Sequence, residues 1–325
     1  MNTSLPSSDC PSSSHETVQV VVACFFLLVF PISLLLNGVA MWVSLHLQSV
    51  STFIVYLKNL VVADLVMTLM LPVKALAMLP EATTELRAFD CRYTGVIYFT
   101  SLYTSIALMG LISLDRFFKI VRPFGKLLGQ NVTFSIIMSS MVWVVLFGCT
   151  AIPIIILTDH APANITDDAK DFCTSLKGPA GVNLSTCVVL FMEILFWVVS
   201  ILIVFCYICI TVKVLQSFRN SGSNNSQGQK KTKLRVFSVL FVFFVCFVPW
   251  HILRIPVSLS ETSDTCPSKW LLIAHELALC VSSTNACLDP FLYIQLCKEY
   301  KAKLADMMKG SSACVKLYCG ERKVS

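Results

Sequence analysis

The sequence predicts an all-α membrane protein built as a bundle of seven transmembrane helices. Only 14% of the 325 residues are charged and 56% are hydrophobic, with a mean hydropathy of +0.75, whereas an average soluble domain is about one quarter charged. Apolar runs recur along nearly the whole chain, and each is long enough to cross a bilayer core, which takes roughly 20 residues per helix. The runs are continuously apolar rather than alternating, which disfavours a transmembrane β-barrel.

The apolar runs divide the chain into three regions. Residues 1–18 are polar and have no basic segment before the first run, so we expect an N-terminal tail and no cleavable signal peptide. The bundle takes residues 19–297, and residues 298–325 form a second tail. Some runs are long because tilted helices can exceed the bilayer thickness. The seven spans are expected at residues 19–46, 53–79, 91–120, 133–157, 184–217, 234–260 and 268–297.

Basic residues are distributed unequally between the two sides of the predicted bundle. Residues 1–18 contain no Lys or Arg, whereas the segment 218–235 has several and no acid. By the positive-inside rule the N-terminus lies outside and the C-terminus inside, in the plasma membrane. The net charge of +6 then reflects the inner segments rather than nucleic-acid binding. Two sequons on the outer side predict glycosylation, at Asn2 and Asn164.

The C-terminal tail begins with an amphipathic pattern. Tyr300, Leu304 and Met307 or Met308 share one helical face, which predicts a short helix over residues 298–308 on the inner leaflet. Cysteines near the membrane on this side can be palmitoylated. The candidates are Cys297, Cys314 and Cys319.

Most of the 15 cysteines fall within spans, where they are expected to pack as small apolar residues. Four lie at the oxidising outer face, namely Cys10, Cys91, Cys173 and Cys266. Four cysteines allow three disulfide connectivities, between which the residues alone do not choose. No spacing of Cys and His resembles a metal site.

Ionisable side chains inside a membrane are costly and therefore mark functional sites. Asp64 and Asp289 both fall deep within spans, near Ser105 and Asn285. Two carboxylates in a low-dielectric bundle repel each other, so they need a cation or a shared proton, unless they belong to a structural hydrogen-bond network. We expect a sodium-like site at these four residues, and no cofactor besides an allosteric sodium ion.

Taken together, the motifs resemble those of a rhodopsin-like G-protein-coupled receptor over residues 19–308. Trp143 and Tyr207 stand in the fourth and fifth spans as in that family. The other matching stretches are Leu60-Val-Val-Ala-Asp64, Asp115-Arg116-Phe117, Phe244-Val-Cys246-Phe247-Val-Pro249 and Asp289-Pro290-Phe-Leu-Tyr293. Each motif is weak alone, but their order and matching depth make the resemblance specific.

The resemblance implies a disulfide pattern and a switch. Cys91 would pair with Cys173, and Cys10 with Cys266. Arg116 would contact a heterotrimeric G protein after the sixth helix swings outward, and arrestin and membrane lipid are further expected partners. The switch residues that the resemblance implies are Asp115, Arg116, Tyr207, Phe247, Pro249, Asp289, Pro290 and Tyr293.

A finer resemblance is to the purinergic receptors for ADP and UDP-sugars, which couple mainly to Gi proteins. In that subgroup, an Arg and a His of helix 6 and a Lys of helix 7 hold the ligand phosphates, and an aromatic residue of helix 3 stacks on the base. The chain departs from the pattern at His275, where the subgroup has Lys, and at Glu261, where it has Gln. The ligand residues that the resemblance implies are Arg254, His251, Lys177, Tyr103, Phe99, His275, Glu276, Arg87 and Lys74.

The sequence is also compatible with other functions. An anionic lipid such as a lysophospholipid could place its headgroup at Arg254 and its chain among the apolar neighbours, and the ligand could also be a peptide or absent. A transporter or channel is less favoured because no internal repeat is present. No set of nucleophile, base and orienting group suggests an enzyme.

Overall fold

The computed structural model describes residues 13–47, 51–121, 131–160, 169–220, 226–262 and 268–321, and all of their regular structure is helical. The α-helices are α1 (Ser13–Leu45), α2 (Thr52–Met78), α3 (Thr84–Phe89), α4 (Gly95–Val121), α5 (Val132–Trp143), α6 (Ile152–Ile156), α7 (Ala169–Ser175), α8 (Pro179–Asn220), α9 (Ser226–Thr262), α10 (Lys269–Ser283), α11 (Asn285–Leu296) and α12 (Lys298–Glu321). Two π-helical stretches, η1 (Asp90–Thr94) and η3 (Val144–Ala151), join α3 to α4 and α5 to α6.

Within these residues, seven helical stretches are long and apolar enough to cross a membrane, which confirms the predicted fold class. They are Thr17–Leu45, Thr52–Met78, Thr84–Val121, Val132–Ile156, Pro179–Ser217, Phe237–Ser258 and Lys269–Leu296. The third stretch combines α3, η1 and α4, and the seventh combines α10 and α11. The fifth begins earlier than predicted, at Pro179, because proline is well accommodated at the first helical position.

Polar side chains begin several helices by accepting hydrogen bonds from the first backbone amides. Ser51 caps α2 through the amide of Ile54, and Ser268 caps α10 through that of Leu271. Asn131 caps α5 by accepting a hydrogen bond from the amide of Thr133 at 2.9 Å. Because these amides have no partner within the helix, each cap fixes where its helix starts.

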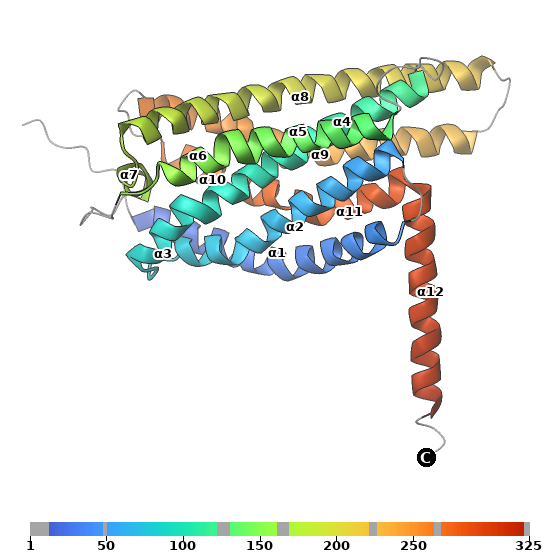
Figure 1. The fold of residues 1–325 in the computed structure, drawn as a ribbon, viewed down its shortest axis with the longest axis horizontal. Coiled ribbons are helices and arrows are strands. Elements are labelled where there is room, and N and C mark those ends of the chain that lie inside the picture. The colour runs from blue at the N-terminus through green and yellow to red at the C-terminus, as the bar shows by residue number, and fades with distance from the viewer. Residues whose placement is uncertain are drawn as a thin grey trace, which may run out of the picture.

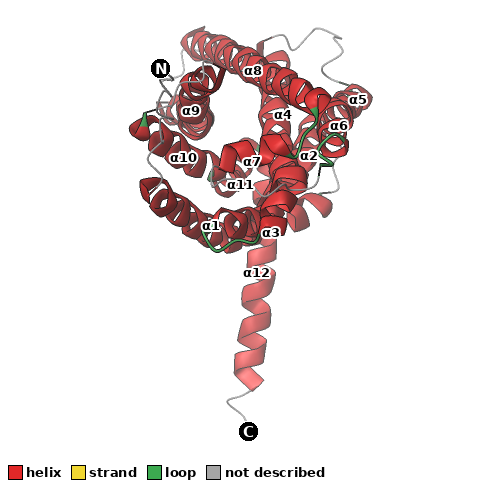
Figure 2. Cartoon of the chain, turned by 90° about the vertical axis from the view of Figure 1, so that its left-hand side faces the viewer, coloured by secondary structure: helices red, strands yellow, loops and turns green. Residues whose placement is uncertain are grey.

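Helix α4 is the central element of the bundle and packs against both α2 and α8. Of the seven stretches, the one that contains α4 has the largest share of buried residues in its apolar part, 67%. A Cβ at Gly110 would lie only 3.0 Å from Val199 Cγ1, so glycine allows α4 and α8 to approach closely here. Figure 2 shows the bundle from one end, with the long helices arranged around its axis.

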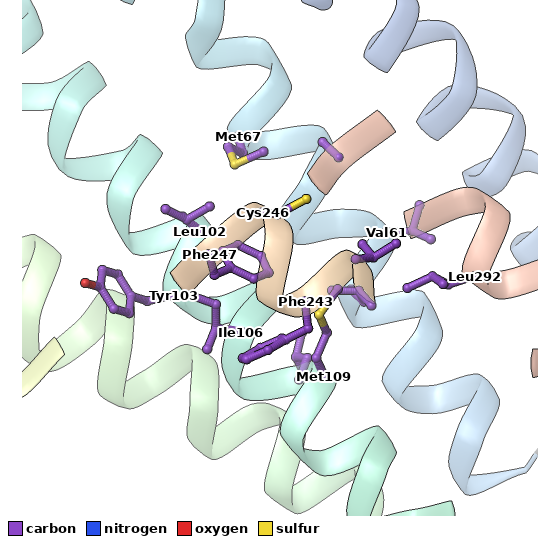
Figure 3. Packing of buried hydrophobic residues seen from close by; sticks show 14 of the residues in the cluster. Val61, Met67, Leu102, Tyr103, Ile106, Met109, Phe243, Cys246, Phe247 and Leu292 are labelled. Carbon is purple, nitrogen blue, oxygen red and sulfur yellow. The ribbon is translucent and has the colours of Figure 1, made fainter. Parts of the chain in front are cut away.

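The buried core joins α9 to α2 and α4. Figure 3 shows Phe243, Cys246 and Phe247 of α9 among side chains from these helices, including Met67 and Ile106. Outward-facing residues are also apolar, which suits contact with lipid rather than water. Examples are Leu28, Ile201 and Phe237, whose exposed fractions are 69%, 69% and 62%.

Helix α12 is longer than the predicted helix over 298–308. It leaves the end of α11 and runs across the direction of the bundle helices (Figure 1). Tyr300 anchors its first turn, since this side chain is buried and its ring lies 6.0 Å from that of Tyr293. Cys297 is also buried, and its Sγ accepts a hydrogen bond from the Tyr300 amide, which disfavours it as a palmitoylation site. The side chains of Cys314 and Cys319 lie outside the described part.

Candidate ligand site and switch

The Cys91–Cys173 disulfide ties η1 to α7, with a Cα–Cα distance of 5.4 Å. We call this side of the bundle the disulfide end and the opposite side the Arg116 end. Figure 1 shows α3 and α7 together at the disulfide end, while α12 starts at the other. Cys10 and Cys266, and the predicted glycosylation sites Asn2 and Asn164, lie outside the described residues.

A group of aromatic and cationic side chains gathers from α2, α4 and α9 towards the disulfide end; we call it the aromatic–cation cluster. The rings of Phe99 and Trp250 stack with their centroids 5.5 Å apart. Lys74 Nζ lies 5.1 Å from the Phe99 centroid, and the Arg254 guanidinium lies 4.7 Å from the Trp250 centroid. Both cations are therefore placed near the negative faces of aromatic rings. Tyr103 is the fifth member of the cluster.

Arg254 is held within this cluster but remains half-buried and without a salt bridge among the residues that the structure describes. Its Nη1 donates a hydrogen bond to the Tyr103 hydroxyl at 3.0 Å. Lys74 differs, because its Nζ lies 3.9 Å from a carboxylate oxygen of Asp90. Arg254 thus presents a fixed charge and further N–H donors, a combination suited to an anionic group.

His251 lies one helical turn from Arg254 and is fully buried. Its Nδ1 lies 3.0 Å from Glu193 Oε2, and its ring stacks on Phe196 with a centroid distance of 3.5 Å. Trp197 Nε1 donates to the other oxygen of Glu193 at 2.9 Å. Glu193 is an acid within an apolar span, which marks a candidate functional residue, but it was not among the predicted ligand residues.

The remaining predicted ligand residues are less closely joined to the cluster. The ring of His275 lies 5.9 Å from that of Trp250, and its Nδ1 lies 3.9 Å from a carboxylate oxygen of Glu276. Lys177 donates to the Ser185 hydroxyl at 2.9 Å, and burial lowers the pKa of its ammonium group. Arg87 donates instead to backbone carbonyls, those of Leu79 and Pro80.

The predicted sodium-like residues meet at the centre of the bundle. Asp64 accepts hydrogen bonds at 2.9 Å from both the Ser105 hydroxyl and the Tyr293 hydroxyl. Asp289 lies beside Asp64, and neither of its oxygens accepts a hydrogen bond from a described donor group. The amide group of Asn285 is likewise buried without a hydrogen-bond partner within the described chain. These orphaned oxygens are suited to a small cation.

At the Arg116 end, Asp115 and Arg116 point to different partners. The Asp115 carboxylate accepts hydrogen bonds from Thr52 and from Lys119, whose Nζ lies 2.9 Å away. Arg116 Nη2 donates to the backbone carbonyl of Leu296, at the end of α11, at 2.8 Å. Arg116 therefore links α4 directly to the last turn of the seventh span.

The other predicted switch residues lie on α8, α9 and α11. Tyr207 is buried on α8, and Phe247 is fully buried on α9. Pro249 lies inside α9 and Pro290 inside α11. Proline removes a backbone hydrogen bond within a helix, which makes local bending easier at these two positions.

Comparison with known proteins agrees with this architecture. Residues 36–293 match the family described as "7 transmembrane receptor (rhodopsin family)". The chain is 40% identical over 304 residues to purinoceptor 13 of Homo sapiens, covering 93% of this chain and 84% of that protein. It is 36% identical over 307 residues to purinoceptor 14 of Bos taurus, covering 93% and 90%. It is also 37% identical over 291 residues to G-protein coupled receptor 87 of Mus musculus, covering 88% and 79%.

The family match spans most of the chain and includes both the central polar site and Arg116. The relatives cover nearly the whole bundle, and the structure has the seven membrane-crossing stretches that such receptors require. The chain therefore belongs to the rhodopsin family of seven-transmembrane G-protein-coupled receptors, and it is a multi-pass plasma-membrane protein rather than an enzyme.

Proposed function

We propose that this receptor responds to an extracellular nucleotide or nucleotide-sugar and activates a Gi-type G protein. The observation that carries the proposal is the Arg254 guanidinium, held by Tyr103 and Trp250 and half-buried without a salt bridge among the described residues. The names of the purinoceptor relatives support a ligand of this class. The proposal places the disulfide end outside the cell and the Arg116 end inside.

In the proposed complex, the ligand phosphates bind Arg254, and Lys74 and Lys177 add positive charge around them. Charged groups of this kind form hydrogen bonds about twice as strong as neutral ones. Contacts with α9 and α10 that differ between the two receptor states then shift their equilibrium. Movement of α9 at Pro249 would carry the change to the Arg116 end, where the G protein binds.

The test is inhibition of forskolin-raised cAMP in cells that express the receptor, with ADP, UDP-glucose and a lysophospholipid as ligands. We expect a nucleotide response whose half-maximal concentration rises at least about thirtyfold in Arg254→Ala, because truncating one partner of a buried charged contact removes much of the binding energy. Arg92→Ala is the matched control, since Arg92 is not a predicted ligand residue and its Nε donates to the backbone carbonyl of Ile155; its response should equal that of the wild type.

Two outcomes would contradict the proposal. A response to the lysophospholipid alone would assign the site to anionic lipids instead. A nucleotide response that is equally strong in Arg254→Ala would place the phosphates elsewhere. Surface expression of each variant is measured in parallel, so that loss of receptor is not mistaken for loss of binding.

We also propose that a sodium ion binds between Asp64 and Asp289 as an allosteric ligand. A cation here relieves the repulsion between two buried carboxylates and joins α2 to α11. Tyr293 already donates to Asp64, so a bound ion would hold the seventh span in the arrangement described here. Repacking of α11 during activation would then have to break these contacts, and sodium would oppose activation.

The sodium proposal is tested by nucleotide exchange on the G protein in sodium chloride and in N-methylglucamine chloride of equal ionic strength. We expect sodium to lower agonist potency about fivefold or more, a common size for allosteric coupling. The effect should vanish in Asp64→Asn and persist in Asp306→Asn, a control in an exposed acid of α12. Equal potency in both salts would contradict a sodium site, and a dependence on pH alone would indicate a shared proton.

A further inference from the structure

The contact between His251 and Glu193 determines which nitrogen of the imidazole carries hydrogen. A carboxylate can only accept, so Nδ1, which lies 3.0 Å from Glu193 Oε2, must be the donor. Trp197 donates to the other oxygen of Glu193, so Oε2 is left to accept from His251. In a neutral ring with hydrogen on Nδ1, Nε2 is left with a lone pair and acts as an acceptor.

The surroundings of His251 favour this neutral ring. The side chain is 0% exposed and its ring lies 3.5 Å from that of Phe196. The rings of Tyr103 and Trp250 lie 5.5 Å and 4.8 Å away, each close to perpendicular to the imidazole. Arg254 already places a positive charge one helical turn away. A second positive charge in this apolar site would be costly. Among the described residues, Glu193 is the only carboxylate in contact with the ring, and so the only one that would offset that cost.

Nε2 of His251 is itself buried and has no hydrogen-bond partner among the described residues. An unsatisfied acceptor in this position is unusual, because buried polar atoms are nearly always paired. The imidazole packs against the rings of Tyr103 and Trp250, which both belong to the aromatic–cation cluster. The His251 side chain is therefore next to the proposed ligand site, and its Nε2 lacks a hydrogen-bond donor, which a ligand can supply.

We propose that Glu193 is a positioning residue that holds His251 with hydrogen on Nδ1, so that Nε2 accepts a hydrogen bond from the nucleoside part of the ligand. The donor is a sugar hydroxyl or an amino group of the base. This inference rests on the proposed nucleotide function and adds the orientation of the bound nucleotide. The nucleoside lies at the depth of His251, and the phosphates lie at Arg254.

The charges around His251 favour a nucleoside group rather than a phosphate at this ring. The resemblance to purinergic receptors assigns the helix 6 histidine, here His251, to the phosphates. In this chain a phosphate at that ring would also lie near the Glu193 carboxylate, and two like charges in a poorly solvated site repel strongly. A hydroxyl or amino group introduces no such repulsion.

The functional test compares ADP with two analogues in the cAMP assay. One is 2′,3′-dideoxy-ADP, which lacks the sugar hydroxyls, and the other is purine riboside diphosphate, which lacks the amino group of the base. In the wild type we expect one analogue to be about tenfold weaker than ADP, because His251 Nε2 then stays buried without a donor. Which analogue is weaker identifies the source of the donor.

The variants test whether Glu193 acts through His251. Glu193→Gln keeps the shape of the side chain, but an amide donates as well as accepts and no longer selects one form of the ring. We expect the tenfold preference to be largely lost in Glu193→Gln and in His251→Phe. Trp197→Phe is the matched control: it removes the other hydrogen bond to Glu193 but leaves His251 in contact, so the preference should remain.

A second measurement needs no ligand and separates this inference from the proposed function. Nitrogen-15 spectra of purified receptor labelled at its five histidines distinguish which ring nitrogen carries hydrogen, and the signal lost in His251→Phe identifies His251. We expect hydrogen on Nδ1 alone near neutral pH in the wild type and a mixture in Glu193→Gln.

The outcomes are separable. Hydrogen on Nε2 of His251 in the wild type, or on both nitrogens, would overturn the inference whatever the ligand. The expected spectra without any nucleotide response would leave the positioning role of Glu193 standing and refute the nucleotide as ligand. A preference for ADP that is equally strong in all variants would show that the donor binds elsewhere.

Discussion

Replacing Cys91 with serine is expected to remove most of the receptor from the cell surface. The Cys91–Cys173 disulfide closes a loop with a sequence separation of 82 residues. Disulfides that close long loops contribute about 2–5 kcal/mol, mainly by restricting the unfolded chain. This one also holds α7 against η1, and Lys177 lies two residues after the end of α7. Surface labelling of an epitope-tagged receptor measures the loss.

A cysteine outside the disulfide provides the control. Cys187 is exposed on α8 and forms no disulfide in the structure, so Cys187→Ser should reach the surface at the wild-type level. Cys173→Ser should match Cys91→Ser, since either change breaks the same bond. Normal surface levels and normal agonist potency in Cys91→Ser would show that packing alone holds this end of the bundle.

Replacing Arg116 with alanine is expected to abolish G-protein activation while leaving ligand binding intact. Arg116 lies at the end opposite the disulfide, where it donates to the Leu296 carbonyl and lies over the Phe53 ring, 4.1 Å from its centroid. The change removes the hydrogen bond that links the Arg116 guanidinium to the end of α11. It also removes the cation that the proposed coupling presents to the G protein. Agonist-stimulated nucleotide exchange on purified Gi measures the effect.

Ligand binding to the same preparation shows whether the receptor remains folded. The number of sites and the affinity without G protein should equal those of the wild type, because the aromatic–cation cluster lies at the other end. Lys309→Ala, in an exposed residue of α12, should leave exchange unchanged. Substantial exchange by Arg116→Ala would assign coupling to other residues.

Much of the fold could be predicted from the chain because lipid imposes strict rules on it. A backbone in hydrocarbon must satisfy its own hydrogen bonds, so each long apolar run has to be a helix. The predicted spans accordingly agree with the observed ones. The ends were less predictable: α12 continues to Glu321, well beyond the predicted residue 308. Helix ends depend on caps and solvent rather than on apolar length.

The candidate site was predictable only in part. The ionisable residues within spans identified the Asp64–Asp289 pair, since charges in lipid are costly. Glu193 belonged to the same class of residue, but its partner His251 is 58 residues away along the chain. Arg87 carries the same charge as Arg254, yet it bonds the backbone just before its own helix, α3. Side-chain type identifies what a residue can bind, and only its position in the bundle decides what it does bind.

Composition and the hydropathy of each segment were thus enough to predict the class of protein, the number of spans and the residues able to carry charge into the membrane. These follow from composition and from the transfer energy of each segment, which are properties of the chain alone. The tertiary structure decided which of those residues meet. The stacking of Phe99 on Trp250, the placement of Arg254 against Tyr103 and the pairing of Glu193 with His251 all join different helices. Such contacts depend on helix rotation and packing, which no single segment specifies.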